Sequence, residues 1–226
     1  MPLEPFAEGV WIASAPQKYL GWQLGTRMTV LRLSDASLLL HSPIALDESL
    51  KSEIDALGPV SHIVAPNLFH HLYVGPAADA FPEAKVHGPA GLRTKRPDLR
   101  LDALLGTETD PSWRGDLEMI QVEGTLLDET IFCHKPSRTL VCADLIENFR
   151  TADDWWTRSY LKLGGIYGKI GLSRMLRLAY RDRRKARRDI DRLLEWDFDP
   201  IVLAHGDPIG SNGADALRES YDWLRG

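Results

Sequence analysis

Short apolar strands and amphipathic helices alternate along the first half of the chain. Residues 27–33 alternate polar and apolar side chains, and an apolar run at 37–41 follows a turn, so this pattern predicts a β-hairpin. Residues 47–57 place Leu50, Ile54 and Leu57 on one face and precede Gly58-Pro59, which predicts a helix that ends there. The other elements expected in this half are strands at 9–13, 60–65 and 85–87 and a helix at 71–80.

The second half of the chain also combines short strands with helices. Strands are expected at 117–122, 130–134 and 139–143, and the last two form a hairpin about the turn 135–138. A long helical stretch at roughly 153–195, a strand at 200–204 and a helix at 213–224 complete the chain. Helices and hairpins in both halves predict an α/β (α+β) fold in which two mixed β-sheets pack together between helices. We expect a single domain over 1–226, with a helical insertion at about 151–195.

Composition narrows the class of protein. The 226 residues are 44% hydrophobic and 26% charged, which excludes a disordered chain, and no apolar run is long enough for a transmembrane helix. The net charge of −5 argues against a nucleic-acid-binding protein. The N-terminus lacks a basic, apolar leader, so we expect a cytoplasmic location.

Two cysteines are too few for a disulfide framework or a thiolate metal site. Cys133 and Cys142 lie in the strands of the predicted hairpin. We interpret them as small buried hydrophobic residues, in preference to a redox pair.

Histidine and aspartate side chains follow several of the predicted strands at their carboxyl ends. His41 ends one strand, His70 and His71 come shortly after another, and Asp144 and His205 each follow a strand directly. Ligands in layered α/β folds favour this edge, and imidazole with carboxylate is a common ligand set for zinc or iron. The pattern therefore indicates a metal site, although each histidine alone is also compatible with an ordinary hydrogen-bonded loop.

The remaining histidines occupy other positions. His62 lies near the start of its strand, and His134 lies beside the hairpin turn, far from the end of the next strand where Asp144 is found. We interpret both as structural. His87 ends a strand, and the sequence does not decide its role.

These features together resemble a known superfamily. The order hairpin, helix, strand, histidine cluster, helix, later aspartate and final strand-His-Gly is similar to that of the metallo-β-lactamase superfamily, whose members are mostly metal-dependent hydrolases with an αββα sandwich. The segments that carry a closer resemblance, to an uncharacterised branch known only as a domain of unknown function, are Ala65-Pro66-Asn67-Leu68-Phe69-His70-His71, Pro136-Ser137-Arg138-Thr139-Leu140, Asp144 and His205-Gly206-Asp207.

The chain departs from the superfamily pattern at half of the usual site. Aligned on its last histidine, the HxHxDH signature falls on Pro66, Leu68, His70 and His71, so both leading histidines are missing and His70 replaces the aspartate. Thr125 stands where the family has its next histidine ligand. The resemblance therefore implies that the first of two metal positions is lost.

The second metal position is retained in part. The resemblance implies one Zn²⁺ ion, with Fe as the alternative, held by His70, His71, His205 and Asp144; a fully degenerate site would bind none. Asp144 is the expected catalytic group, and His41 is expected beside the ligands or as an extra ligand. The leading hypothesis is a mononuclear metal-dependent hydrolase or lyase acting on an unknown small molecule. The alternative is a non-catalytic protein of the same fold that binds a ligand or partner.

The segment 151–192 combines aromatic residues with a concentration of positive charge. Between 158 and 192, twelve Lys and Arg residues stand against three Asp. One interpretation is a lid whose aromatic residues cover the pocket and whose arginines attract an anionic substrate. A second is a helical pair with a solvated basic face. Attachment to a membrane surface is less favoured, because the densest arginine run has few large apolar residues.

Overall fold

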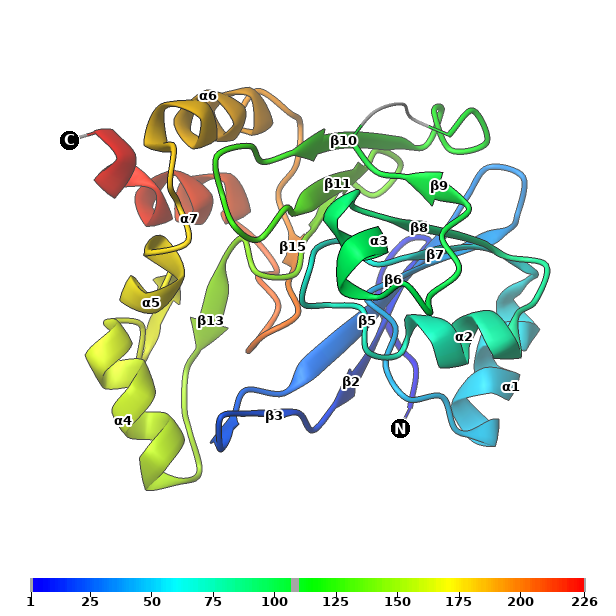
Figure 1. The fold of residues 1–226 in the computed structure, drawn as a ribbon, viewed down its shortest axis with the longest axis horizontal. Helices are drawn as coiled ribbons and strands as arrows, with labels where there is room; N and C mark the ends of the chain where they lie inside the picture. The colour runs from blue at the N-terminus through cyan, green and yellow to red at the C-terminus, as the bar shows by residue number, and fades with distance from the viewer. Residues whose placement is uncertain (1, 107–109, 226) are drawn as a thin grey trace.

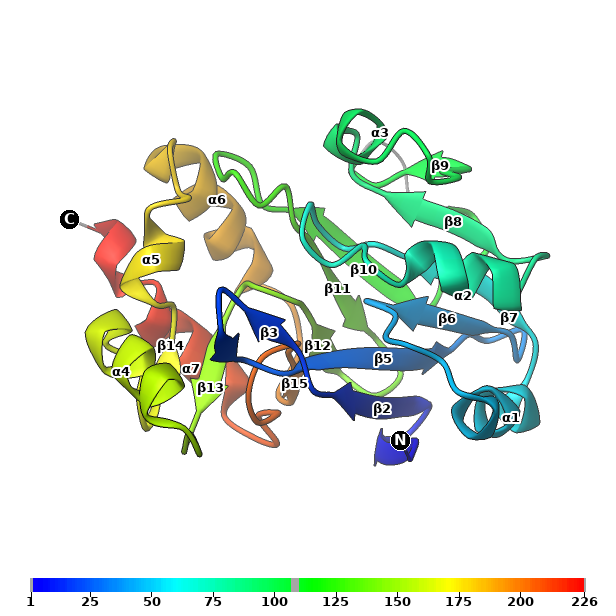
Figure 2. The same cartoon turned by 60° about the horizontal axis from the view of Figure 1, so that its bottom comes forward.

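The computed structural model describes residues 2–106 and 110–225 and contains two mixed β-sheets (Figures 1 and 2). The larger sheet has seven strands in the order β1-β2-β5-β6-β7-β8-β9. The pairs from β1 to β6 are antiparallel, and those from β6 to β9 are parallel. Its strands are β1 (Glu4–Ala7), β2 (Val10–Ala15), β5 (Thr26–Arg32), β6 (Leu38–His41), β7 (Val60–Val64), β8 (Lys85–Gly88) and β9 (Ala103–Leu104).

The smaller sheet has four strands in the order β10-β11-β12-β15, with only β12 and β15 parallel. Its strands are β10 (Leu117–Gln121), β11 (Thr130–His134), β12 (Thr139–Val141) and β15 (Ile201–Val202). Two small antiparallel pairs lie outside both sheets: β3 (Lys18–Tyr19) with β4 (Trp22–Gln23), and β13 (Glu147–Phe149) with β14 (Lys169–Gly171).

Helices cover the outer face of each sheet. Helices α1 (Glu48–Leu57), α2 (Val74–Ala80) and α3 (Gly91–Lys95) bury their apolar residues against the larger sheet. Helices α6 (Arg183–Leu193) and α7 (Gly213–Ser220) do so against the smaller one, and a 3-10 turn (Asp222–Arg225) follows α7. A third apolar cluster, which includes Trp113 and Phe132, fills the space between the sheets. These layers confirm the predicted αββα sandwich.

Local sequence signals account for several elements. The two predicted hairpins form as β5–β6 and β11–β12. The N-terminus of α1 is capped by Asp47, whose Oδ1 accepts a hydrogen bond from the Leu50 amide at 2.8 Å. Cys133 and Cys142 are buried free thiols, as expected, and burial raises the pKa of Cys133 to about 12, so its thiol stays protonated.

The prediction of one long helical stretch at 153–195 is wrong. The segment contains α4 (Trp155–Gly164), then β14, then α5 (Arg174–Arg177) and finally α6. Gly165 ends α4 with a left-handed φ of 78°, and Gly168 has a φ of 69°, which lets the chain turn back into β14. The expected strand at 200–204 is also shorter, at Ile201–Val202.

The small β3–β4 hairpin fixes α4 in place. The ring of Trp22 stacks on Tyr160 with centroids 4.1 Å apart, and the Gln23 amide donates to Thr157 Oγ1 at 2.8 Å.

Among the described helices, none has both the length and the apolar character needed to cross a bilayer.

Candidate metal centre at the strand ends

Three strand ends deliver imidazole and carboxylate groups to one place. Asp144 and His205 follow the parallel neighbours β12 and β15, so they leave the smaller sheet at the same edge. His70 lies in the loop after β7, a strand of the larger sheet. The structure therefore brings these three predicted residues together across the two sheets.

The ligand atoms of this triad face one another. His70 Nε2 lies 3.2 Å from His205 Nε2 and 3.5 Å from Asp144 Oδ2, and His205 Nε2 lies 3.3 Å from Asp144 Oδ1. All three side chains are largely shielded from solvent. Two imidazole nitrogens and a carboxylate at this spacing form a group that can hold a metal ion.

The outward-facing nitrogens of both histidines have partners. His205 Nδ1 lies 2.8 Å from the Gly25 carbonyl oxygen, and His70 Nδ1 lies 2.8 Å from Ser42 Oγ. A carbonyl oxygen only accepts, so Nδ1 of His205 carries a proton and the Nε2 of the neutral ring presents a lone pair to the Asp144 carboxylate. Two acceptors at 3.3 Å require a positive group between them, either a proton or a cation. The donor set thus fits a divalent ion, with each ring oriented from behind.

Asp144 is positioned by two residues that come from other loops. The Asn67 side-chain amide donates to Asp144 Oδ2 at 2.8 Å, while Asn67 Oδ1 accepts from the amides of Phe69 and His70 at 2.8 Å. The buried Glu129 carboxyl accepts from the Asp144 amide, with both of its oxygens at 3.1 Å. One asparagine therefore holds both the carboxylate and the loop that carries His70.

The charged groups of the centre shift one another's pKa. Burial works to raise the pKa of Asp144, but the adjacent His70 and His205 hold that pKa well below its usual range. Burial works against protonation of His205, whereas its hydrogen bond with Asp144 and that charge together raise its pKa. Burial and the charge of Asp144 raise the pKa of Glu129 to about 8. Asp144 is therefore the carboxylate that stays ionised here.

His71 and His41, also predicted as site residues, lie outside the triad. His71 Nδ1 lies 3.1 Å from Arg96 Nη1; because a guanidinium only donates, this nitrogen accepts and is occupied. His41 is fully buried, its ring packs edge-on against Phe132, and its Nε2 has no hydrogen-bond partner among the described residues. Burial and the nearby His70 lower the pKa of His41 to about 3, so its ring is neutral.

A cavity of about 760 Å³ opens above the triad. Its volume lies within the range of ordinary small-molecule sites. The walls are mainly apolar, and Glu147, Lys95 and Arg181 are the other charged side chains that line it besides the triad. The apolar lining comes from Tyr19, Leu24, Pro43, Phe69, Leu72, Tyr73, Leu126, Leu127, Tyr160, Met175, Leu176, Leu178 and Ala179.

The predicted helical insertion at 151–195 supplies a wall of this cavity. Tyr160 of α4 lines it, as do four residues in and just after α5: Met175, Leu176, Leu178 and Ala179. The basic helix α6 contributes none of the lining residues; its Arg187 pairs with Asp191, and Arg188 lies 3.1 Å from Glu123. In the described part of the chain, most of the arginines of the dense 181–192 run thus lie away from the cavity.

Sequence reasoning missed three residues of the site. Asn67 lies in the motif 65–71, but nothing in the sequence marks it as a site residue. Glu129 and Glu147 have few local features that distinguish them from surface carboxylates. Glu147 is buried, its Oε2 accepts from the Ser173 amide at 3.0 Å, and burial raises its pKa. The local signal for Glu147 is a charged residue between the apolar residues Ile146 and Phe149.

Comparison with known proteins supports the fold assignment. A family described as "Domain of unknown function (DUF4336)" matches residues 7–92. No protein of curated function matches the sequence.

Three similar solved structures are those of metallo-β-lactamases. The enzyme from Pontibacter korlensis has 16% sequence identity and a TM-score of 0.69, over 99% of this chain and 98% of that one. The one from Hirschia baltica has 13% identity and a TM-score of 0.67, over 99% and 96%. FIM-1 from Pseudomonas aeruginosa, in its mono-zinc form, has 13% identity and a TM-score of 0.65, over 98% and 95%. The chain therefore has the metallo-β-lactamase fold over nearly its whole length.

Proposed function

We propose that the protein is a mononuclear metal-dependent hydrolase, or a related lyase, that acts on a small amphiphilic molecule. The observation that carries the proposal is the triad of His70, Asp144 and His205, whose unshared donor atoms face one another beneath an apolar cavity. Zn²⁺ suits two imidazoles and one carboxylate, and Fe²⁺ is the alternative that the same ligands accept.

The residues of the triad would have different roles in the reaction. A bound ion supplies Lewis acidity and a water molecule that is nucleophilic at neutral pH. His70 and His205 would hold the ion through Nε2, because Ser42 and Gly25 engage their other ring nitrogens. Asp144, ionised and fixed by Asn67, would orient the attacking water and accept its proton.

The cavity lining supports an amphiphilic substrate. Its apolar walls suit a hydrocarbon portion, and apolar contact contributes roughly 25 cal/mol for each Å² removed from water. Lys95 and Arg181 lie on the same walls and attract a negatively charged group. An ester, lactone or amide with an acyl chain and an anionic group satisfies both features.

One observation supports a second candidate, a non-catalytic ligand-binding module. An additional proton on His205 Nε2 would be donated to Asp144 Oδ1, 3.3 Å away, without any metal. In that case the cavity would bind an amphiphile without converting it.

Metal analysis together with turnover separates the two candidates. Protein purified without an affinity tag is analysed for zinc and iron, and then assayed against short- and long-chain esters and lactones with His205→Ala as the reference. The hydrolase predicts metal at the triad and turnover that His205→Ala abolishes. Tight amphiphile binding by a metal-free, inactive protein would establish the binding module instead.

A further inference from the structure

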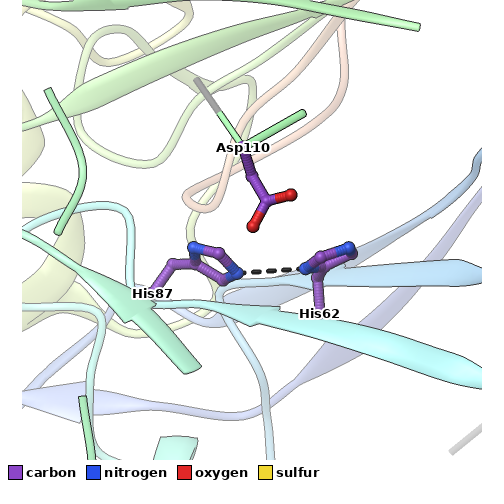
Figure 3. A group of neighbouring side chains, drawn as sticks. All are labelled: His62, His87 and Asp110. Atoms are coloured by element: carbon purple, nitrogen blue, oxygen red, sulfur yellow. Dashed lines mark hydrogen bonds between the residues drawn. The ribbon is translucent and has the colours of Figure 1, made fainter. Parts of the chain in front are cut away.

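A second group of metal-ligating side chains lies away from the cavity, at the larger sheet (Figure 3). It consists of His62 on β7, His87 on β8 and Asp110 from the segment before β10. The parallel register pairs His62 with Lys85 and Val64 with His87, so the two histidines are diagonal neighbours on one face of the sheet. One ligand atom from each of the three residues lies within 4.8 Å of the other two.

The two imidazoles are enclosed. His62 and His87 are buried, and the ring of Trp113 packs on both, with centroid separations of 4.8 and 4.5 Å. Their facing nitrogens, His62 Nδ1 and His87 Nε2, lie 3.0 Å apart. The Asp110 carboxylate points toward the two imidazoles (Figure 3), and this side chain is only 12% exposed.

The hydrogen bonds around Asp110 decide which nitrogen of His62 is free. Ser112 Oγ lies 2.6 Å from Asp110 Oδ1 and 2.9 Å from His62 Nε2. An ionised carboxylate only accepts, so the Ser112 hydroxyl donates to Asp110 and accepts from His62 Nε2–H. The lone pair of the neutral His62 ring is then on Nδ1, the atom that faces His87. Aspartate, serine and histidine thus form the kind of outer contact that orients a ligating imidazole.

The charge balance also favours a cation. Lys85 is the cation nearest to Asp110 among the described ion pairs, with Nζ 3.4 Å from Oδ2, and its side chain is 60% exposed. A divalent ion in this position would replace a weak surface ion pair with buried coordination.

We propose that His62, His87 and Asp110 bind one divalent transition-metal ion, with Zn²⁺ as the expected ion, at a site separate from the catalytic cavity. The segment that carries Asp110 and Trp113 connects β9 of the larger sheet to β10 of the smaller one. An ion bound to Asp110, His62 and His87 would connect this segment to β7 and β8. The ion is therefore structural: it stabilises the packing of the two sheets and takes no part in the proposed reaction.

Zinc titration of the metal-free protein tests this site without reference to activity. With both sites competent, the parent protein binds two equivalents, whereas His87→Gln and His205→Ala each bind one and the double variant binds none. Zinc raises the thermal midpoint of His205→Ala but not that of the double variant. His134→Gln is the matched control, because His134 is a buried histidine bonded to Ser137 and the Arg32 carbonyl, and it leaves both equivalents in place.

Asp110→Asn provides an independent variant with an almost unchanged shape. It lowers zinc affinity at this site at least about tenfold, and it decides the question if His87→Gln does not fold, as judged by circular dichroism. Zinc binding that survives unchanged in Asp110→Asn and His205→Ala,Asp110→Asn overturns the proposal, as does a His205→Ala protein that binds no zinc. A parent protein with one equivalent, lost in His87→Gln but not in His205→Ala, supports this site and contradicts the ion at the triad.

Discussion

The Nδ1 atom of His205 lies 2.8 Å from the carbonyl oxygen of Gly25, a contact that joins the two sheets at the edge of the candidate site. Gly25 precedes β5 of the larger sheet, and His205 follows β15 of the smaller one. Because the carbonyl can only accept, this one bond sets the tautomer of His205 and turns its Nε2 toward Asp144. The chemistry of the site thus depends on how the sheets are packed.

Replacing His205 with alanine tests the triad directly. His205→Ala removes one of two imidazoles that face Asp144, so we expect zinc affinity at this site to fall at least about 100-fold, beyond the effect of losing an outer contact alone. Competition with a chromophoric chelator measures the loss. His134→Ala is the matched control and keeps the affinity; equal losses in both variants would contradict the assignment of the triad.

Asn67 holds Asp144 and is not itself an expected ligand, so we expect its removal to lower zinc affinity less than the loss of His205 does. Asn67→Ala frees Asp144 Oδ2 and the loop of His70, and we expect zinc affinity to fall roughly 10- to 100-fold with the ligands all present. The loss of two backbone contacts also lowers the free energy of unfolding by about 1–2 kcal/mol. Isothermal titration and urea unfolding measure the two effects. Unchanged zinc affinity in a destabilised variant would restrict Asn67 to a structural role.

The apolar cavity predicts selectivity for chain length. Each methylene buried in it contributes about 0.8 kcal/mol, so kcat/KM in a homologous ester series rises about fourfold for each added carbon. Phe69→Ala and Leu178→Ala flatten this series and leave acetyl esters unaffected, because both residues line the cavity. Leu163→Ala is the control, since Leu163 is 77% exposed and lines a different, smaller pocket. A length dependence that persists in all three variants would place the acyl chain elsewhere.

Two cations in the cavity wall, and not the basic helix, are expected to attract an anionic substrate. Lys95→Gln with Arg181→Gln raises KM for anionic substrates and weakens its dependence on salt. Neutralising Arg183, Arg184, Arg187 and Arg188 together leaves the fold, metal content and KM unchanged. Liposome binding at low salt that is strong in the parent and absent in this quadruple variant would establish a membrane-binding surface.

His41 makes the metal-free protein sensitive to acid. Its pKa is about 3 in the folded state and about 6.5 in the unfolded chain, so below pH 6.5 the unfolded state binds the extra proton. The free energy of unfolding attributable to this group therefore falls by about 1.4 kcal/mol per pH unit between pH 6.5 and 3. His41→Leu removes this component, so its stability declines less steeply with acid in urea titrations from pH 7 to 4. Identical slopes in variant and parent would show that His41 does not remain neutral in the fold.

Local pattern predicted the architecture well where one residue period extended over a whole element. The alternation at 27–33 predicted β5, the apolar run at 37–41 predicted β6, and the face of Leu50 and Ile54 predicted α1, because the burial of an element dictates the pattern of its apolar residues. The prediction of a helical stretch at 153–195 is wrong because no single residue period extends over the whole segment. Its glycines permit tight turns whose direction depends on contacts far along the chain, such as the pairing of β14 with β13.

The sequence by itself determined that His70, Asp144 and His205 follow strands at the edge where loops of an αββα sandwich meet, because strand direction and chain order set that edge. The tertiary structure alone decided that His70, and not its neighbour His71, faces Asp144, because adjacent loop residues have no fixed period. It alone decided the tautomer of His205, through Gly25, and the grouping of His62 and His87 with Asp110. Those relationships depend on sheet register and on the packing of one sheet against the other, which no local pattern encodes.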